Sequence, residues 1–274
     1  MQHGFLVVDK QPGMTSHDVV SVARRSLGTR KVGHAGTLDP MATGILVLGF
    51  NNGTRLLRYI TDGDKDYLAT MVLGSATVTD DSQGEVINST DASHISDQQV
   101  EDEIAKMRGT ILQRPSSVSA VKIDGERAYN RVRSGEDVVL PAREVTISSL
   151  EILQIRRMDS AIEVDIHVTC SAGTFIRAIA RDCGAALGVG GHLNSLRRTR
   201  IAGFGLERAV TLDQLKSKDF ETLDIADVAR STFAVREIAL DEKIELSFGR
   251  ALAANPDSSI YAGIDSSNQL IALL

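Results

Sequence analysis

The sequence predicts an α+β protein, with a large domain built around a mixed sheet and a small β-rich domain at the C-terminal end. Three patterns predict it. Strand-like and helix-like segments alternate up to residue 73, residues 161–170 alternate with period two, and residues 235–274 alternate short strand-like runs with polar turns. A chain of 274 residues can bury one full-sized core and a smaller one.

The first elements follow from local signals. Residues 5–10 predict a short strand, and a turn follows it. Thr15 and Asp18 form a capping box that opens a helix, which Gly28 can end. The chain therefore begins with a strand, a turn and a helix.

The next segments continue this alternation. Residues 45–48 form an apolar run suited to a buried strand, Thr54 can cap a helix through Tyr59, and residues 65–73 are strand-like. Residues 100–108 predict a helix, and the chain past residue 209 is expected to be acidic and rich in loops.

Residues 161–170 carry the clearest strand pattern, in which apolar and polar side chains alternate. A turn at residues 171–174 leads into a helix that ends near Gly188. This places Arg177 in the first turn of that helix. Cys170 and Cys183 have no second Cys or His at zinc spacing, so we interpret both as small core residues.

The most distinctive segment is Gly33-His34-Ala35-Gly36-Thr37-Leu38-Asp39-Pro40-Met41-Ala42-Thr43-Gly44, which sets one carboxylate in a glycine-rich loop. Pro40 biases Asp39 toward an extended conformation, and the glycines permit close approach of another molecule. Taken alone, a solvated Asp-Pro turn is the commoner case. The loop alone therefore does not predict a functional carboxylate at Asp39, and other parts of the sequence have to support one.

Known cofactor motifs do not fit this chain. Residues 184–191 are glycine-rich but follow a helix, whereas the dinucleotide fingerprint follows a strand. The sequence has no P-loop ending, no Gly-x-Ser-x-Gly elbow and no His-x-x-x-His pair. We therefore expect neither a nucleotide cofactor nor a metal.

Charge is unevenly distributed in this chain of net charge −6. Residues 1–60, 105–145 and 171–210 have an excess of Lys and Arg, whereas residues 61–104 and 211–274 are acidic. The basic segments are consistent with a polyanion-binding face or with scattered solvated side chains. The first apolar stretch is too short for a signal peptide or a membrane span, so we expect a cytoplasmic protein.

Two arginine groups suggest an anion nearby. Arg177 and Arg181 lie four residues apart on a helix face, and Asp39 could be the anion between them, although isolated surface arginines are common. Arg197 and Arg198 are typical of residues that contact phosphates, and equally of a basic run that is simply solvated.

Together these segments resemble the TruB family of pseudouridine synthases, the bacterial tRNA pseudouridine-55 synthases. The resemblance covers residues 3–208 and rests on five motifs. They are Val8-Asp9-Lys10-x-Pro12-Gly13-Met14-Thr15-Ser16, the 33–44 loop, Asp64-Lys65-x-Tyr67, Gly173-Thr174-Phe175-Ile176-Arg177 and Leu196-Arg197-Arg198. Two departures are Phe175, where many members have Tyr, and Arg55, where many have Lys.

The resemblance implies roles for individual residues. Asp39 matches the catalytic aspartate, which either attacks or deprotonates the target nucleoside. Tyr67 matches the tyrosine that stacks on the flipped uracil and accepts the proton from its C5 atom. Arg177 matches the arginine that pairs with the aspartate, Leu196 an apolar residue under the base, and His34 the histidine that fills the gap in the RNA stack.

The resemblance also implies the architecture. It predicts the pseudouridine synthase fold, with a central mixed, largely antiparallel sheet flanked by helices and loops. Residues 1–208 would form the catalytic domain, in which residues 117–143 form a thumb-like insertion that grips the RNA. Residues 209–274 would form a small PUA-like RNA-binding domain. Lys10, Arg197 and Arg198 are expected to contact the RNA.

The implied function is the isomerisation of uridine 55 in the T loop of tRNA to pseudouridine, a reaction that needs no cofactor and no metal. The expected partner is the T-arm stem-loop, and we expect a monomer with no membrane contact and no obligate protein partner. A non-catalytic RNA-folding chaperone on the same scaffold is the alternative, which Asp39, Tyr67 and Arg177 disfavour. The short C-terminal region and the lack of basic tails disfavour an RNA-guided enzyme.

Overall fold

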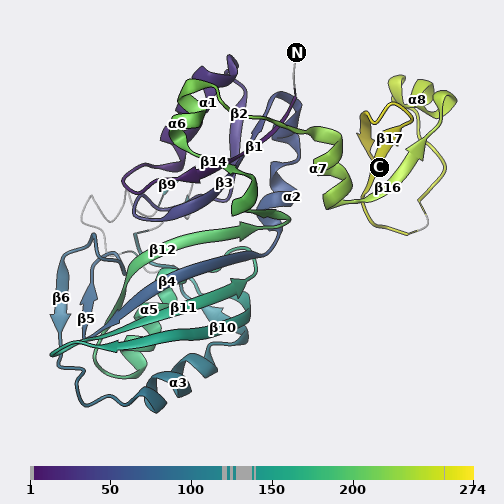
Figure 1. Ribbon diagram of the computed structural model, residues 1–274. Helices are drawn as coiled ribbons and strands as arrows, with labels where there is room; N and C mark the ends of the chain where they lie inside the picture. The colour runs from purple at the N-terminus through teal and green to yellow at the C-terminus, as the bar shows by residue number, and fades with distance from the viewer. Residues whose placement is uncertain (1–2, 119–121, 124–125, 128–137, 139, 256) are drawn as a thin grey trace. The chain divides into compact units, whose positions relative to one another are not determined.

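The computed structural model describes residues 3–118, 122–123, 126–127, 138, 140–255 and 257–274 (Figure 1). The chain forms two compact units. The first contains residues 1–39, 45–61 and 202–274, and the second contains residues 40–44 and 62–201. Most of the predicted RNA-gripping insertion, residues 117–143, lies outside the described residues.

The first unit combines strands from both ends of the chain. Its elements are β1 (Gly4–Lys10), α1 (Ser16–Leu27), β2 (Val32–Ala35), most of β3 (Thr43–Phe50), the 3₁₀ turn η1 (Asn51–Arg55), α2 (Leu57–Asp62), β13 (Phe204–Gly205), the 3₁₀ turn η2 (Leu206–Arg208), β14 (Ala209–Val210), α6 (Leu212–Ser217), β15 (Leu223–Asp224), α7 (Ile225–Thr232), β16 (Ala234–Ile238), α8 (Leu240–Ser247), β17 (Tyr261–Asp265) and β18 (Leu270–Leu273). β1 pairs with β14 in parallel and with β15 antiparallel. Segments distant in sequence thus complete the sheet around β1.

The second unit is organised around long antiparallel strands. Its elements are β4 (Lys65–Leu73), β5 (Ser75–Thr77), β6 (Val86–Ser89), α3 (Asp97–Lys106), β7 (Gly109–Gln113), β8 (Lys122–Ile123), β9 (Glu126–Arg127), β10 (Arg143–Arg157), β11 (Ile162–Cys170), α5 (Ile176–Ala186) and β12 (Gly191–Ile201). Strands β12, β4, β11 and β10 neighbour one another in that order (Figure 1), β7 follows β10, and all these pairs are antiparallel. The start of β3 joins β12 in parallel. The predicted α+β class and the mixed, largely antiparallel sheet are confirmed.

Local patterns account for the central elements. Side chains of β11 alternate between buried and half-buried along its whole length, as the period-two pattern predicted. α5 packs against β12 and β4, and its side chains Ile179, Ala180 and Cys183 are fully buried. Burial also raises the pKa of the Cys183 thiol to about 12 and that of Cys170 to about 11, so both remain protonated core residues.

The first helix forms as its end signals predicted. The Thr15 hydroxyl accepts a hydrogen bond from the backbone N–H of Asp18, and the Asp18 carboxylate accepts one from the backbone N–H of Thr15. At the other end, Gly28 adopts a left-handed conformation with φ of 64°. These caps define α1, whose buried face carries Val19, Val20 and Ala23.

Two predictions about helices were wrong. Thr54 does not cap a helix, because its hydroxyl donates to the carbonyl of Asn51 inside the 3₁₀ turn η1, and α2 begins only at Leu57. The region past residue 209 contains three helices, α6, α7 and α8, where loops and strands were expected. A capping box at Thr211 and Gln214 starts α6, a signal that the acidic composition obscured.

Gly44 marks the closest approach of β3 to β12. It has φ of +94°, and a Cβ atom placed there would lie 2.1 Å from the carbonyl oxygen of Arg198. We expect Gly44→Ala to lower the free energy of unfolding by roughly 2–6 kcal/mol, because backbone strain and overlap add. Gly28→Ala, at φ of +64° with open space around it, is the matched control and should cost only about 1–2 kcal/mol. Equal losses in urea unfolding would contradict this account.

Candidate active site

The loop that carries Asp39 is anchored to the start of α1. The buried Ser16 hydroxyl accepts a hydrogen bond from the backbone N–H of Leu38 at 2.9 Å, and it donates to the Leu38 carbonyl at 3.2 Å. Asp39 itself is half-buried, and the following Pro40 is exposed. The residue before Asp39 is therefore held in place, so the position of the carboxylate is restricted.

Lys10 brings a cation to the same loop. It is fully buried at the end of β1, and its ammonium donates to the carbonyls of Gln11 and Met14 at 3.0 and 2.7 Å. Burial lowers the pKa of Lys10 to about 8, and the Asp39 and Asp18 carboxylates partly offset that effect. Lys10 was predicted to contact RNA. Its complete burial beside Asp39 instead indicates a role in holding the loop.

The lowered pKa of Lys10 predicts a pH dependence of stability. The unfolded chain keeps a proton on Lys10 up to its usual pKa of 10.5, whereas the folded chain releases it near pH 8. The free energy of unfolding should therefore rise with pH between these values. We expect the gain from pH 7 to 9.5 to be about 2 kcal/mol larger for the parent than for Lys10→Met. Equal gains in urea unfolding would show that Lys10 titrates normally when folded.

His34 lies in β2, on the strand that leads into the Asp39 loop. It is half-buried, and its ring meets that of His17 edge-on, with centroids 5.6 Å apart and planes 80° apart. His34, Lys10 and Asp39 all belong to the first compact unit. The structure therefore gathers three of the predicted site residues around one loop.

Tyr67 and Leu196 lie on neighbouring strands of the second unit. Each is 7 % exposed. Arg198 of β12 pairs with Gly44 of β3 on one side and with Tyr67 of β4 on the other. Because adjacent strands lie about 4.8 Å apart, Tyr67 is two strand spacings, about 10 Å, from the end of the glycine-rich loop.

The arginines of β12 are in different environments. Arg197 is half-buried, with Nη1 3.4 Å from the Thr43 hydroxyl. Arg198 is 1 % exposed, and Arg200 makes a two-pronged ion pair with Asp66 at 2.7 Å. The predicted phosphate contact of Arg198 conflicts with this burial. Arg197 therefore stays in the proposed set of RNA contacts, and Arg198 is removed from it.

Arg177 lies in the first turn of α5, as predicted, and its side chain is almost fully buried. Its Nη1 atom donates to the Thr79 carbonyl at 2.6 Å and lies 3.3 Å from the Asp81 carboxylate. Its Nη2 atom donates to the Val118 carbonyl at 3.0 Å. The Asp81 side chain is only 6 % exposed, so this is a buried ion pair with its hydrogen bonds arranged around it.

Arg181, one turn further along α5, has its own acidic partners. Its guanidinium reaches Asp80 at 3.1 Å and Asp182 at 2.8 Å, and it donates to the Arg114 carbonyl. The sequence interpretation missed Asp80 and Asp81 as partners of the arginine pair. The two adjacent carboxylates in an acidic segment were the available signal. The pairing of Arg177 with Asp39 stays a prediction.

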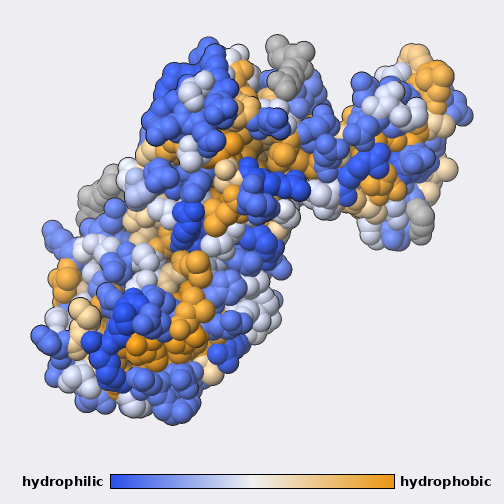
Figure 2. Space-filling model, in the orientation of Figure 1, coloured by the Kyte–Doolittle hydropathy of each residue, from blue (hydrophilic) through white to orange (hydrophobic). Residues whose placement is uncertain are grey.

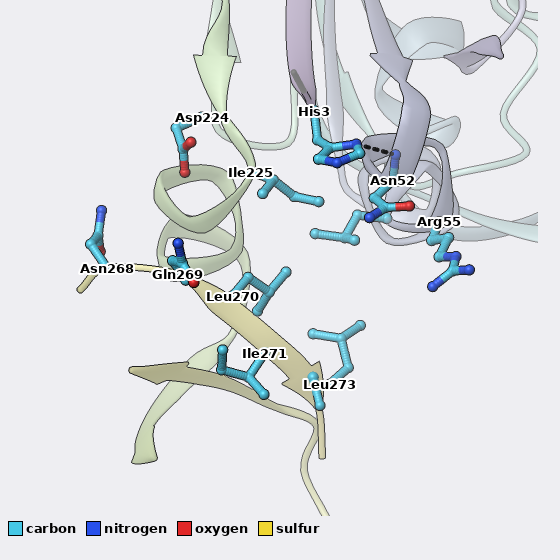
Figure 3. Close-up of a pocket in the computed structure, with 12 residues that line it drawn as sticks. His3, Asn52, Arg55, Asp224, Ile225, Asn268, Gln269, Leu270, Ile271 and Leu273 are labelled. Carbon is cyan, nitrogen blue, oxygen red and sulfur yellow. Dashed lines mark hydrogen bonds between the residues drawn. The ribbon is translucent and has the colours of Figure 1, made fainter. Parts of the chain in front are cut away.

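A cavity of about 670 Å³ lies in the first unit, and none of these residues lines it (Figure 3). Leu56, Ile225 and strand β18 give it apolar walls, and Arg55 and His3 lie at its edge. The His3 ring accepts a hydrogen bond from the backbone N–H of Asn52 at 3.3 Å. None of the predicted catalytic residues lines this cavity, so it is not the predicted active site.

Among the residues that the structure describes, no group of three or more His, Cys, Asp or Glu side chains is arranged to hold a metal ion. In the same ranges, no helix has the length and apolar character needed to cross a membrane.

Comparison with known proteins identifies the family. A model of the TruB family pseudouridylate synthase N-terminal domain matches residues 24–176, more than half of the chain. The chain belongs to the TruB family. A second model, of the tRNA pseudouridylate synthase B C-terminal domain, matches residues 177–233. As a pseudouridylate synthase, this TruB-family protein is an isomerase.

Relatives named tRNA pseudouridine synthase B match this TruB-family chain over nearly its whole length. The protein from Paenarthrobacter aurescens (strain TC1) is 50 % identical and aligns with 100 % of this chain and 91 % of its own. The protein from Mycobacteroides abscessus is 49 % identical over 99 % of this chain and 91 % of its own.

Solved structures support the fold. A Cbf5–Nop10–Gar1 complex contains a chain with a TM-score of 0.73 and 25 % identity, which covers 99 % of this chain and 78 % of that one. An H/ACA RNP bound to a substrate RNA gives a TM-score of 0.72 at 24 % identity, covering 98 % and 77 %. The pseudouridine synthase fold is thereby confirmed.

Proposed function

We propose that this TruB-family enzyme converts uridine 55 in the T loop of tRNA to pseudouridine, with Asp39 as the catalytic carboxylate. The relatives' common name, tRNA pseudouridine synthase B, supports tRNA as the substrate. The observation that carries the proposal for Asp39 is its anchored loop. Ser16 fixes the preceding residue, and the ammonium of Lys10 lies close enough for the Asp39 carboxylate to raise its pKa.

The reaction is an isomerisation, so its atoms balance without a co-reactant. The bond from uracil N1 to ribose C1′ breaks, the uracil turns, and a bond from C5 to C1′ forms. The C5 proton is lost to a base, and N1, which is no longer bonded to the ribose, takes up a proton. Asp39 either attacks the ribose or removes a proton, and both routes need a carboxylate held against the nucleoside. Tyr67 is proposed to stack on the uracil and to accept the C5 proton.

The target base must leave its stack before it can react. That costs a few kcal/mol, which stacking on an aromatic ring and insertion of a side chain into the gap offset. We propose that Tyr67 supplies the stacking surface, that Leu196 packs under the base, and that His34 fills the gap. The positions of Tyr67 and Leu196 on paired strands β4 and β12 are consistent with this assignment.

RNA binding is proposed to rest on exposed cations. Arg24, Arg25 and Lys31 are exposed at the end of α1 and just beyond it, and Arg197 is half-buried. We propose that residues 1–208 contain the chemistry and that the insertion at 117–143 grips the hairpin. The proposed partner is the T-arm, bound by a monomer.

Sequencing of modified tRNA tests the function directly. In cells that lack this protein, we expect uridine instead of pseudouridine at position 55 of all elongator tRNAs, and a plasmid copy of the gene should restore the pseudouridine. Pseudouridine that persists at position 55, with loss at another position, would assign a different target to the enzyme.

A further inference from the structure

Residues 234–274 form a small module that begins one residue beyond the end of the second family match. Strand β17 pairs in parallel with β16 and antiparallel with β18, and helix α8 connects β16 to the rest. The core of the module contains Ile238, Ala262 and Ile264. The small C-terminal sheet that the sequence predicted is thus present, with one helix added.

Every cation of this module has a carboxylate partner. Its three Lys and Arg residues form ion pairs, Arg236 with Glu242 at 2.7 Å, Lys243 with Asp265 at 2.6 Å and Arg250 with Glu245 at 3.0 Å. Arg236 and Lys243 lower the pKa of the Glu242 and Asp265 carboxyls through these hydrogen bonds.

The module is therefore acidic. Glu237, Asp241 and Asp257 add three carboxylates for which the described residues offer no cation partner. RNA affinity comes mainly from Lys and Arg side chains that neutralise phosphates. A surface with an excess of carboxylates repels phosphates instead, so the charge of residues 234–274 gives no support to the RNA-binding role predicted for residues 209–274, which stays a prediction.

Helix α8 exposes an apolar stripe. Leu240 is 76 % exposed, Ile244 48 % and Phe248, which caps the helix, 69 %. These residues are spaced four apart and therefore lie along one helix face. None of the eight residues of α8 is buried, and Figure 2 shows apolar surface over this helix. We call Leu240, Ile244 and Phe248 the α8 face.

We propose that the α8 face docks a basic amphipathic helix of another protein. The apolar stripe suits the apolar side of such a helix. The module's excess of carboxylates, with the unpaired Asp241 in the first turn of α8, suits its Lys and Arg side chains. The same charges disfavour a second copy of this chain, because two acidic faces would meet. They also disfavour RNA.

The test uses the full-length protein and a labelled synthetic helix of about 18 residues, roughly five turns, with Leu on one face and Lys on the other. A peptide with Glu in place of every Lys is the charge control. By fluorescence anisotropy, we expect the Lys peptide to bind at least about tenfold more tightly than the Glu peptide. The triple variant of the α8 face, Leu240→Gln with Ile244→Gln and Phe248→Gln, should bind the Lys peptide about tenfold more weakly than the parent does.

Leu112→Gln is the matched control, because Leu112 is also 76 % exposed but lies on β7. It should leave peptide binding unchanged. Equal binding of the Lys peptide to the parent and the triple variant would overturn the proposal. A tenfold loss of T-arm hairpin affinity in the triple variant would overturn it in favour of RNA. If the parent sediments as a dimer and the triple variant as a monomer, the proposal is overturned in favour of a second copy of this chain.

Discussion

The Asp39→Asn enzyme should release no tritium above background from tRNA labelled at C5 of uridine, while its affinity for a T-arm hairpin stays within about tenfold of the parent's. Asn keeps the size of the side chain and a carbonyl acceptor. It lacks the charge and the capacity to attack carbon or take a proton. Binding and chemistry should therefore separate in this variant.

Asp18→Asn is the control for this experiment. Asp18 is the other carboxylate that raises the pKa of Lys10, but it belongs to the cap of α1 and not to the glycine-rich loop. Its loss should reduce stability by about 1 kcal/mol and leave turnover near the parent's. Tritium release by Asp39→Asn at a rate close to the parent's would mean that the carboxylate is not catalytic, and would favour the RNA-folding chaperone.

Arg177→Met should reduce both stability and turnover. It leaves the Asp81 carboxylate buried without its cation, and such a loss costs about 3–5 kcal/mol. The proposed pairing with Asp39 would also be lost, so we expect the single-turnover rate constant to fall at least about a hundredfold. Urea unfolding and single-turnover kinetics measure the two effects separately.

The double variant Arg177→Met with Asp81→Asn separates a structural role from a catalytic one. The amide that replaces the Asp81 carboxylate is neutral and can keep the hydrogen bonds that Asp81 accepts from Thr79 and Gln83. We expect the double variant to recover most of the lost stability, because no unpaired charge remains buried. Turnover should stay low. If turnover recovers along with stability, Arg177 supports the fold and does not position Asp39.

Elements with local signals were predictable from the sequence. The capping box and Gly28 define α1, and the alternation in residues 162–170 defines β11, because both patterns depend on neighbours within a few residues. The helices past residue 209 were missed because acidic composition was given more weight than the capping signals at Thr211 and Asp224.

Partners that are distant in sequence were not predictable. The pairing of Arg177 with Asp81 joins residues 96 positions apart, and the adjacent carboxylates of Asp80 and Asp81 do not by themselves show which cation they pair with. The burial of individual charged side chains could not be predicted from the sequence either. Lys10 and Arg198 have the residue type of an RNA contact, yet the packing of β1 and β12 removes both from solvent. For Asp39, the glycine-rich loop and the family motifs indicated the residue, and the structure added Ser16 and Lys10 around it.

The central claim is that this TruB-family enzyme isomerises one uridine, at position 55 of tRNA. Tritium release from two transcripts labelled at C5 of every uridine tests it most directly, one with uridine at position 55 and one with cytidine there. We expect one equivalent of tritium per tRNA from the first transcript and none from the second. Equal release from both transcripts, or none from either, would contradict the claim.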